Sequence, residues 1–268
     1  MTQSPPPPAE QQPPIHPAPE PGPGAPPPMP PEPPQSSGVT VALIAVGAAV
    51  VGLVFICIIA LLIGILLPAL GAARSTAQRM QNNTQIRGIH QAMVMYAQGN
   101  NSRFPGITQQ GQSTQVTEAS VHGRLRILLD GNFFTPEYLV SPSETDAAIH
   151  EWQYGNTFTD DNHSYAILSI TAEGARRAEW SETLNSQAIV MGDRNIGAGS
   201  DDAQVESIHN STPGYWRGGV AYNDNRVTFE TTHRLPTRFG SDPANQHPND
   251  NLFEADGDGD ALLIHSGQ

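Results

Sequence analysis

The sequence of 268 residues contains no lysine, and all 13 of its basic residues are arginine. The absence of lysine excludes a P-loop, whose lysine reaches the phosphates of a nucleotide, and every mechanism that proceeds through a Schiff base. The single cysteine, Cys57, excludes an intramolecular disulfide and a paired-cysteine metal site. With 26 acidic residues the net charge is −13, so nucleic-acid binding, which needs a basic face, is not expected.

Residues 1–38 have a composition that builds no folded core. They hold 17 of the 25 prolines, no arginine and almost no apolar side chain. Such a segment buries too little surface to offset its chain entropy, so we expect a disordered, partly polyproline II tail. We expect it to act as a solvated spacer, and the alternative is that its PxxP spacings dock the aromatic groove of a cytoplasmic partner.

A long apolar run follows this tail. No charged residue occurs between Glu32 and Arg74, and the thirty residues from Val41 to Leu70 are almost all apolar. At about 1.5 Å per residue they form a helix of about 45 Å, whereas the bilayer core is about 30 Å thick. The run predicts a single-pass transmembrane helix and is too long for the apolar region of a cleaved secretory signal. The alternative is a helix buried in a soluble core.

Beyond Pro68 the pattern predicts that the helix, residues 39–98, continues with a changed character. Apolar and small residues recur at spacings of three and four in two stripes, first Ala69, Ala73, Thr76, Ala77 and Met80, then Ile86, Ile89, Met93 and Tyr96. The second stripe begins six residues after Met80, and this step rotates the apolar face by about a third of a turn. We therefore expect a bend or a change of packing partner near 82–84, and an end of the helix at Gly99.

Residues 99–268 are long enough to form one globular α+β domain that buries about 70% of its extended-chain surface. Strands are predicted at 163–170, 188–191, 219–222, 226–230 and 261–264, and short helices at 124–129 and 136–140. A turn at 223–225 joins two of these strands into a hairpin that sets Val220 and Tyr222 against Val227 and Phe229.

The long helix carries a family resemblance. Gly47 to Leu70 aligns without gaps to the N-terminal helix of type IV pilin-like proteins and most resembles the large pseudopilin-like families of planctomycete-type bacteria, with LLPAL at 66–70 as the most specific part. Tyr96, Phe104 and Pro105 match the end of the family's amphipathic half. The resemblance implies a pilin-like fold, in which the long helix packs on an antiparallel sheet. It also implies pilin-like or type II secretion proteins as partners.

The resemblance is weaker in the domain and departs from the family at the head of the helix. The family's closing motif is partly matched by Gly218, Gly219, Tyr222, Asp224, Val227 and Phe229. Members that assemble carry a Gly-Phe cleavage site and a glutamate at the fifth mature position. Val46 and Gly47 occupy the cleavage site here, and Val51 occupies the glutamate position. A processed filament subunit is therefore not expected.

No sequence motif predicts an enzyme. GxSxG, HExxH and paired-cysteine zinc motifs do not occur. Ser164, Asp193 and His209 make a triad on paper, but nothing in their spacing requires one. Three tryptophans are expected to anchor the core or an interface rather than to form a ligand cage: Trp152, Trp180 and Trp216.

One loop has the composition of a calcium site. Acidic residues alternate with small ones, and an EF-hand count from the first acidic residue puts them at positions 1, 3, 5 and 7: Glu254, Asp256, Asp258 and Asp260. Position 12 is His265, which supplies no bidentate carboxylate. A Ca²⁺ site is one interpretation, supported by the resemblance because some pseudopilins hold calcium in a C-terminal loop. An acidic, solvated turn is the other.

Two arguments disagree about topology. Arg74, Arg79 and Arg87 follow the apolar run, so the positive-inside rule puts the domain in the cytoplasm. The resemblance implies the reverse, which we adopt: a bacterial inner membrane protein with a cytoplasmic tail and a periplasmic or cell-surface domain. The expectation is a structural or interaction protein accessory to a secretion or pilus-type assembly. The alternative is a membrane-tethered ligand-binding or sensor module whose tail docks a cytoplasmic partner.

Overall fold

The computed structural model describes residues 38–110, 113–257 and 259–266. The chain divides into two compact units, Met1–Ile63 and Gly64–Gln268. Apart from Gly38, the proline-rich segment lies outside the described residues, so its disorder stays a prediction.

The longest element is helix α1, Gly38–Gln98, which ends where the sequence predicted. In the first unit its residues 40–63 are exposed and almost all apolar. By length and composition this helix could cross a membrane, and its most apolar window is not buried against any described residue. Exposed apolar surface of this extent favours a membrane span over the core of a soluble domain.

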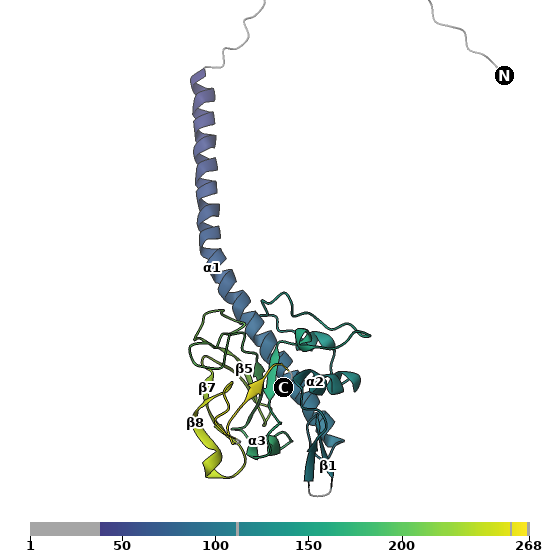
Figure 1. The fold of residues 1–268 in the computed structure, drawn as a ribbon. Coiled ribbons are helices and arrows are strands. Elements are labelled where there is room, and N and C mark those ends of the chain that lie inside the picture. Colours follow the sequence, from purple (N-terminus) through teal and green to yellow (C-terminus); the bar gives the residue numbers. More distant parts are fainter. Residues whose placement is uncertain (1–37, 111–112, 258, 267–268) are drawn as a thin grey trace, which may run out of the picture. The chain divides into compact units, whose positions relative to one another are not determined.

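The second unit is built around one antiparallel sheet of five strands in the order β6-β5-β4-β3-β9. Figure 1 shows this unit and labels β5 of the sheet. The strands, in that order, are Val227–Glu230, Gly218–Tyr222, Ile189–Asp193, Tyr165–Leu168 and Leu263–Ile264. Every residue of the three central strands is buried, so both faces of the sheet are covered. The chain is thus a mixed helix and antiparallel-sheet protein, as predicted.

Two small sheets and several short helices complete this unit. β1 (Ile107–Gln110) pairs with β2 (Ser113–Val116), and β7 (Arg234–Arg238) pairs with β8 (Gln246–Asn251). These four strands were not predicted. The helices are α2 (Val121–Asp130), the single turn α3 (Ala175–Ala178) and the 3-10 turns Pro136–Leu139, Asp160–Asn162 and Pro243–Asn245.

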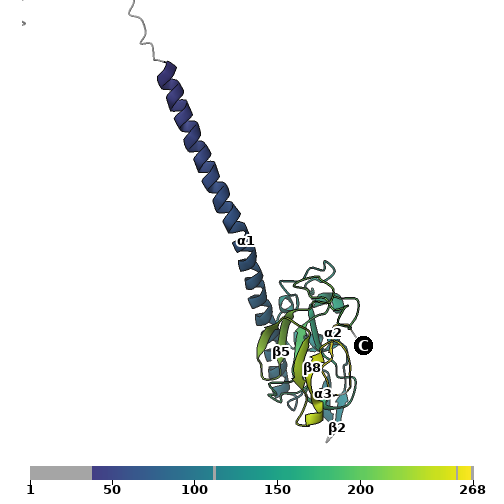
Figure 2. The ribbon, with the colours of Figure 1, turned by 90° about the vertical axis from the view of Figure 1, so that its left-hand side faces the viewer.

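Within the second unit, the later half of α1 crosses the middle of the sheet. Asn82 contacts Tyr165 at the start of β3 and Asp193 at the end of β4. Ile86, one turn later, lies against Gly219 of β5, and Figure 2 shows the end of α1 beside this strand. The second predicted stripe is confirmed as the packed face, since Ile86, Ile89 and Met93 are at most 1% exposed and Tyr96 is partly buried.

The first predicted stripe does not pack on the domain. Its five residues, Ala69, Ala73, Thr76, Ala77 and Met80, are exposed. The face of α1 that turns toward the domain here is polar and consists of Ser75, Gln78, Arg79 and Asn82. Alanine buries little apolar area, so the hydrogen bonds of the polar face decide the rotation of the helix. The helix is unbroken at 82–84, where the exposed first stripe gives way to the buried second stripe.

The predicted hairpin is confirmed, but its register differs from the expectation. β5 pairs with β6 across a turn in which Asn225 has a φ of 67°. Val220 lies opposite Thr228, and Ala221 lies opposite Val227. Because facing residues share a side of the sheet, Val220 and Val227 point to opposite faces. The expected register of the hairpin therefore differs from the observed register by one residue.

The three tryptophans lie in the core, as predicted. Each is at most 2% exposed. Each indole N–H group donates to a backbone carbonyl: that of Trp152 to Asn156, that of Trp180 to Pro105 and that of Trp216 to Arg194. A buried indole with a satisfied N–H is a packing anchor.

The close approach of α1 to β5 requires a glycine at position 219. A Cβ built there would lie 2.5 Å from Cδ1 of Ile86 and 2.7 Å from Oδ1 of Asn83. We expect Gly219→Ala to lower the free energy of unfolding by about 1–3 kcal/mol, because the Ile86 and Asn83 side chains must leave their packed positions. The measurement is chemical unfolding of the full chain in detergent micelles.

The double variant Gly219→Ala with Ile86→Val provides the control. Ile86→Val removes the clashing Cδ1, so the two changes together should cost less than the sum of their separate costs. Additive costs would contradict a contact at this position.

Candidate functional site

The polar centre of the second unit is the carboxylate of Asp193, at the end of β4. Its side chain is fully buried. Asn82 Nδ2 lies 2.9 Å from both carboxylate oxygens, the backbone N–H of Gly219 donates at 2.6 Å, and Nε2 of His209 lies 2.9 Å away. Donors from a helix, a strand and a loop therefore surround one charge. This arrangement compensates the desolvation that an isolated carboxylate would suffer.

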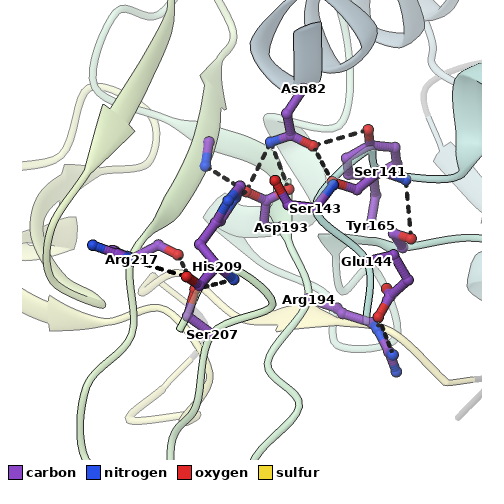
Figure 3. Close-up of polar contacts among 12 residues, drawn as sticks. Asn82, Ser141, Ser143, Glu144, Tyr165, Asp193, Arg194, Ser207, His209 and Arg217 are labelled. Carbon is purple, nitrogen blue, oxygen red and sulfur yellow. Dashed lines mark hydrogen bonds and ion pairs between the residues drawn. The ribbon is translucent and has the colours of Figure 1, made fainter. Parts of the chain in front are cut away.

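Asn82 links this carboxylate to the loop on its other side. Its Oδ1 accepts from the Ser141 hydroxyl at 2.7 Å and from the Tyr165 hydroxyl at 3.1 Å (Figure 3). Burial, followed by the negative charges of Asp193 and Glu144, raises the pKa of Tyr165, so its hydroxyl stays a donor. Asn82 is itself fully buried and has both ends of its amide satisfied.

An ion pair borders this network. Arg194 donates to both oxygens of Glu144 at 2.9 and 3.0 Å, and also to Asp146 at 3.3 Å. Burial alone would raise the pKa of Glu144, but the hydrogen bonds and charge of Arg194 outweigh it and hold that pKa below its usual range. Glu144 is therefore an ionised, neutralised carboxylate whose side chain is 3% exposed.

A cavity of about 230 Å³ opens beside the network. α1 contributes Ser75, Gln78 and Arg79 to its wall, and the segment after Ser141 contributes Ser143, Glu144 and Thr145. His209 and Arg217 close the other side. Most of the residues that line it are thus polar, and two of them are arginines.

The sequence offered Ser164, Asp193 and His209 as a hypothetical catalytic triad, and the structure brings only two of them together. Asp193 and His209 are in contact, as described above. The Ser164 hydroxyl instead accepts from the backbone N–H of Ser141 at 3.1 Å. The nearer hydroxyl, that of Ser207, donates to the carbonyl of Arg217 and accepts from the backbone N–H of His209. The geometry fits a structural pair that orients the His209 loop.

Of the four residues of the calcium interpretation, two are joined directly, because the backbone N–H of Asp256 donates to the Asp260 carboxylate at 2.5 Å. Asp260 points inward and pairs with Arg176 at 3.1 Å. Glu254 accepts from Asn251 at 3.1 Å, and Asp256 is exposed. Asp258 lies outside the described residues. Among the residues that are described, no group of three or more His, Cys, Asp or Glu side chains is arranged to hold a metal ion. Calcium at this loop stays a prediction.

No family model, curated protein or solved structure matches this chain.

The central role of Asn82 was missed by the sequence reasoning. The sequence marks position 82 only as a polar interruption between two stripes. Its partners are far away along the chain, with Ser141 59 residues and Asp193 111 residues later. The usable signal was a run of Asn and Thr inside a helix, where these residues have no local hydrogen-bonding advantage.

Removing Asn82 should weaken the unit strongly. Asn82→Ala deletes the amide that contacts both oxygens of a buried carboxylate, and we expect the free energy of unfolding to fall by about 2–4 kcal/mol. Asn82→Asp should be at least as harmful, because it sets a second carboxylate against Asp193. Chemical unfolding in micelles measures both.

The neighbouring Asn83 is the matched control. Its Oδ1 is buried without a hydrogen-bond partner in the described structure, so Asn83→Ala removes no bond through that atom. Its cost should stay below about 1 kcal/mol. Equal costs at positions 82 and 83 would contradict the network.

A second titratable group lies near the C-terminus. The rings of His265 and His163 are 4.4 Å apart between centroids and tilted by 47°, and Nε2 of His265 lies 2.9 Å from the His163 carbonyl oxygen. Burial, followed by the charge of His163, lowers the pKa of His265 to about 4. The folded state therefore holds His265 neutral at pH values where an unfolded histidine is protonated.

This pKa predicts a pH dependence of stability. Between about pH 6.5 and pH 4 the unfolded chain binds a proton that the folded chain does not, so the free energy of unfolding falls as the pH falls, by at most about 3 kcal/mol. His265→Gln should flatten the curve in this window, whereas the exposed His150→Gln should leave it unchanged. Unfolding midpoints recorded at stepped pH test this, and parallel curves for wild type and His265→Gln would refute it.

Proposed function

We propose that this chain is a single-pass, pilin-like membrane protein with a structural or interaction role, accessory to a secretion or pilus-type assembly. One observation carries the proposal. A single continuous helix has an apolar half whose side chains are exposed and a later half locked onto an antiparallel sheet. A lipid bilayer would bury the apolar side chains of the first half, and the domain buries the side chains of the second half. The motifs at 47–70 support the family.

The head of the helix argues against a processed filament subunit. Cleavage in assembling members frees an N-terminus that a buried glutamate on a neighbouring subunit can pair. Val51 is apolar and 69% exposed, so it offers no such pairing. Burying an unpaired terminus in lipid would cost several kcal/mol. The chain would therefore keep residues 1–46 and stay in the membrane.

The alternative, a membrane-tethered binding or sensor module, is favoured by a different observation. The polar cavity beside Asn82 has a volume that admits a small anion or headgroup. In that case the proline-rich segment would dock a cytoplasmic partner. The two proposals share the membrane span and differ in whether the domain binds a ligand.

The membrane proposal predicts both processing and orientation. Intact mass of the protein from native membranes should equal that of the unprocessed chain, with residues 1–46 present. Protease added to spheroplasts should digest the domain and spare the N-terminal segment, because we place the domain outside the cytoplasm.

A species beginning at Gly47 or Val39 in sheared surface filaments would defeat the processing half. Trimming of the N-terminal segment alone would show that the positive-inside rule holds and that the domain is cytoplasmic. A chain released by alkaline carbonate washing would defeat the membrane span itself. Permeabilised cells, in which protease reaches both sides, serve as the control.

A further inference from the structure

The cavity beside the Asn82 network is held open by its own hydrogen bonds. Gln78 on α1 donates to the carbonyl of Pro142 at 2.9 Å, which fixes the loop against the helix. Arg217 Nη2 donates to the carbonyl of His209 at 2.8 Å, which fixes the opposite wall. The cavity is therefore preformed, and a ligand entering it meets little ordering cost.

The charges that face the cavity leave an excess of positive charge. Arg79 and Arg217 line it together, and burial, followed by the charge of Arg79, lowers the pKa of Arg217. Nε of Arg217 is buried and has no hydrogen-bond partner in the described structure. The one acidic residue in the wall, Glu144, is neutralised by Arg194. An anion in the cavity would offset the repulsion between Arg79 and Arg217 and would accept a hydrogen bond from the unused Nε–H of Arg217.

The remaining lining suits a phosphoryl group in particular. Ser143 and Thr145 bring hydroxyl groups to the wall beside the two guanidinium groups. Guanidinium forks and hydroxyls donate to tetrahedral oxyanions. At about 230 Å³ the cavity admits a phosphate with a few attached atoms and excludes a folded partner.

The position of the cavity along α1 indicates the source of that group. Leu66, Leu67 and Leu70 are more than 60% exposed and end the apolar run. Ser75 and Arg79 follow Leu70 by five and nine residues, or about 8 and 13 Å along the helix. The headgroup layer is about 5–8 Å deep on each side of the bilayer core. Ser75 therefore lies at the outer edge of that layer, and Arg79, whose guanidinium lies 4.8 Å from the centre of the Phe229 ring, lies just beyond it.

We propose that this cavity binds the phosphoryl headgroup of an anionic phospholipid. The lipid source rests on the proposed membrane span, but it holds for either orientation of the domain. Free phosphate shares the same chemistry and is the second source that a test must separate. Binding would tie the domain to the bilayer surface through Arg79 and Arg217.

The test uses the full chain in nanodiscs. One arm compares phosphatidylcholine discs with discs that also contain phosphatidylglycerol. The other arm titrates inorganic phosphate into phosphatidylcholine discs at constant ionic strength. The readout is the unfolding midpoint from tryptophan fluorescence, because a ligand of the folded state raises it. Each variant is compared with its own midpoint in phosphatidylcholine, so any loss of stability cancels.

Arg79→Gln and Arg217→Gln should each weaken apparent binding about tenfold or more. Arg74→Gln, an exposed arginine on the same helix outside the cavity, is the matched control and should bind as wild type does. Arg79→Lys keeps the positive charge but loses the two-pronged guanidinium donor, so its apparent binding should lie between that of wild type and that of Arg79→Gln. A midpoint raised by phosphatidylglycerol alone assigns the lipid, and one raised also by phosphate shows that the phosphoryl group suffices.

The proposal is overturned if neither arm raises the midpoint, or if Arg79→Gln and Arg217→Gln respond as wild type does. It is also overturned if Arg74→Gln loses the response equally, because that indicates diffuse surface charge. A chain that fails to enter discs defeats the membrane span instead. In that case the phosphate titration, run in solution, still tests the cavity.

Discussion

The structure of the second unit depends on satisfying one buried carboxylate. Asp193 ends a fully buried strand, and an unpaired carboxylate there would cost several kcal/mol. Its donors come from α1, from β5 and from the His209 loop. The His209 loop and β5 follow β4 along the chain, whereas Asn82 of α1 lies 111 residues before Asp193. Burying the charge and docking the helix are therefore one event, and the domain has no low-energy way to fold without its own helix.

This coupling makes the later part of α1 belong to the same compact unit as the sheet. The unit begins at Gly64, so its boundary falls inside a continuous helix. A division drawn at residue 98, where the helix ends, follows the secondary structure but separates Asn82 from its partners. The anchor lies twelve residues after Leu70, or about 18 Å along the helix. The polar face before it is free to line a cavity rather than to pack.

Local signals in the sequence were sufficient for part of this fold. The end of α1, the Asn-rich turn of the β5–β6 hairpin and the buried tryptophans each follow from nearby residues. β7 and β8 were hidden because each contains a proline, Pro236 and Pro248, which argues against a central strand. Both lie in a two-stranded sheet, and the register shifts where Pro236 falls. Such pairing depends on partners that no local pattern reveals.

Because α1 is anchored by a polar residue, Asn82, its rotation about its own axis is fixed more tightly than an apolar stripe would fix it. Successive residues of a helix point about 100° apart, so rotating α1 by one residue would replace Asn82 with Gln81 or Asn83. Gln81 is exposed, and Asn83 already lies beside the site with its Oδ1 unpartnered. Either rotation breaks every bond that Asn82 makes to Asp193, Ser141 and Tyr165. Apolar contacts tolerate small rotations, whereas this network is satisfied at one angle only, which fixes the face of the domain that the helix presents with Arg79 toward the cavity.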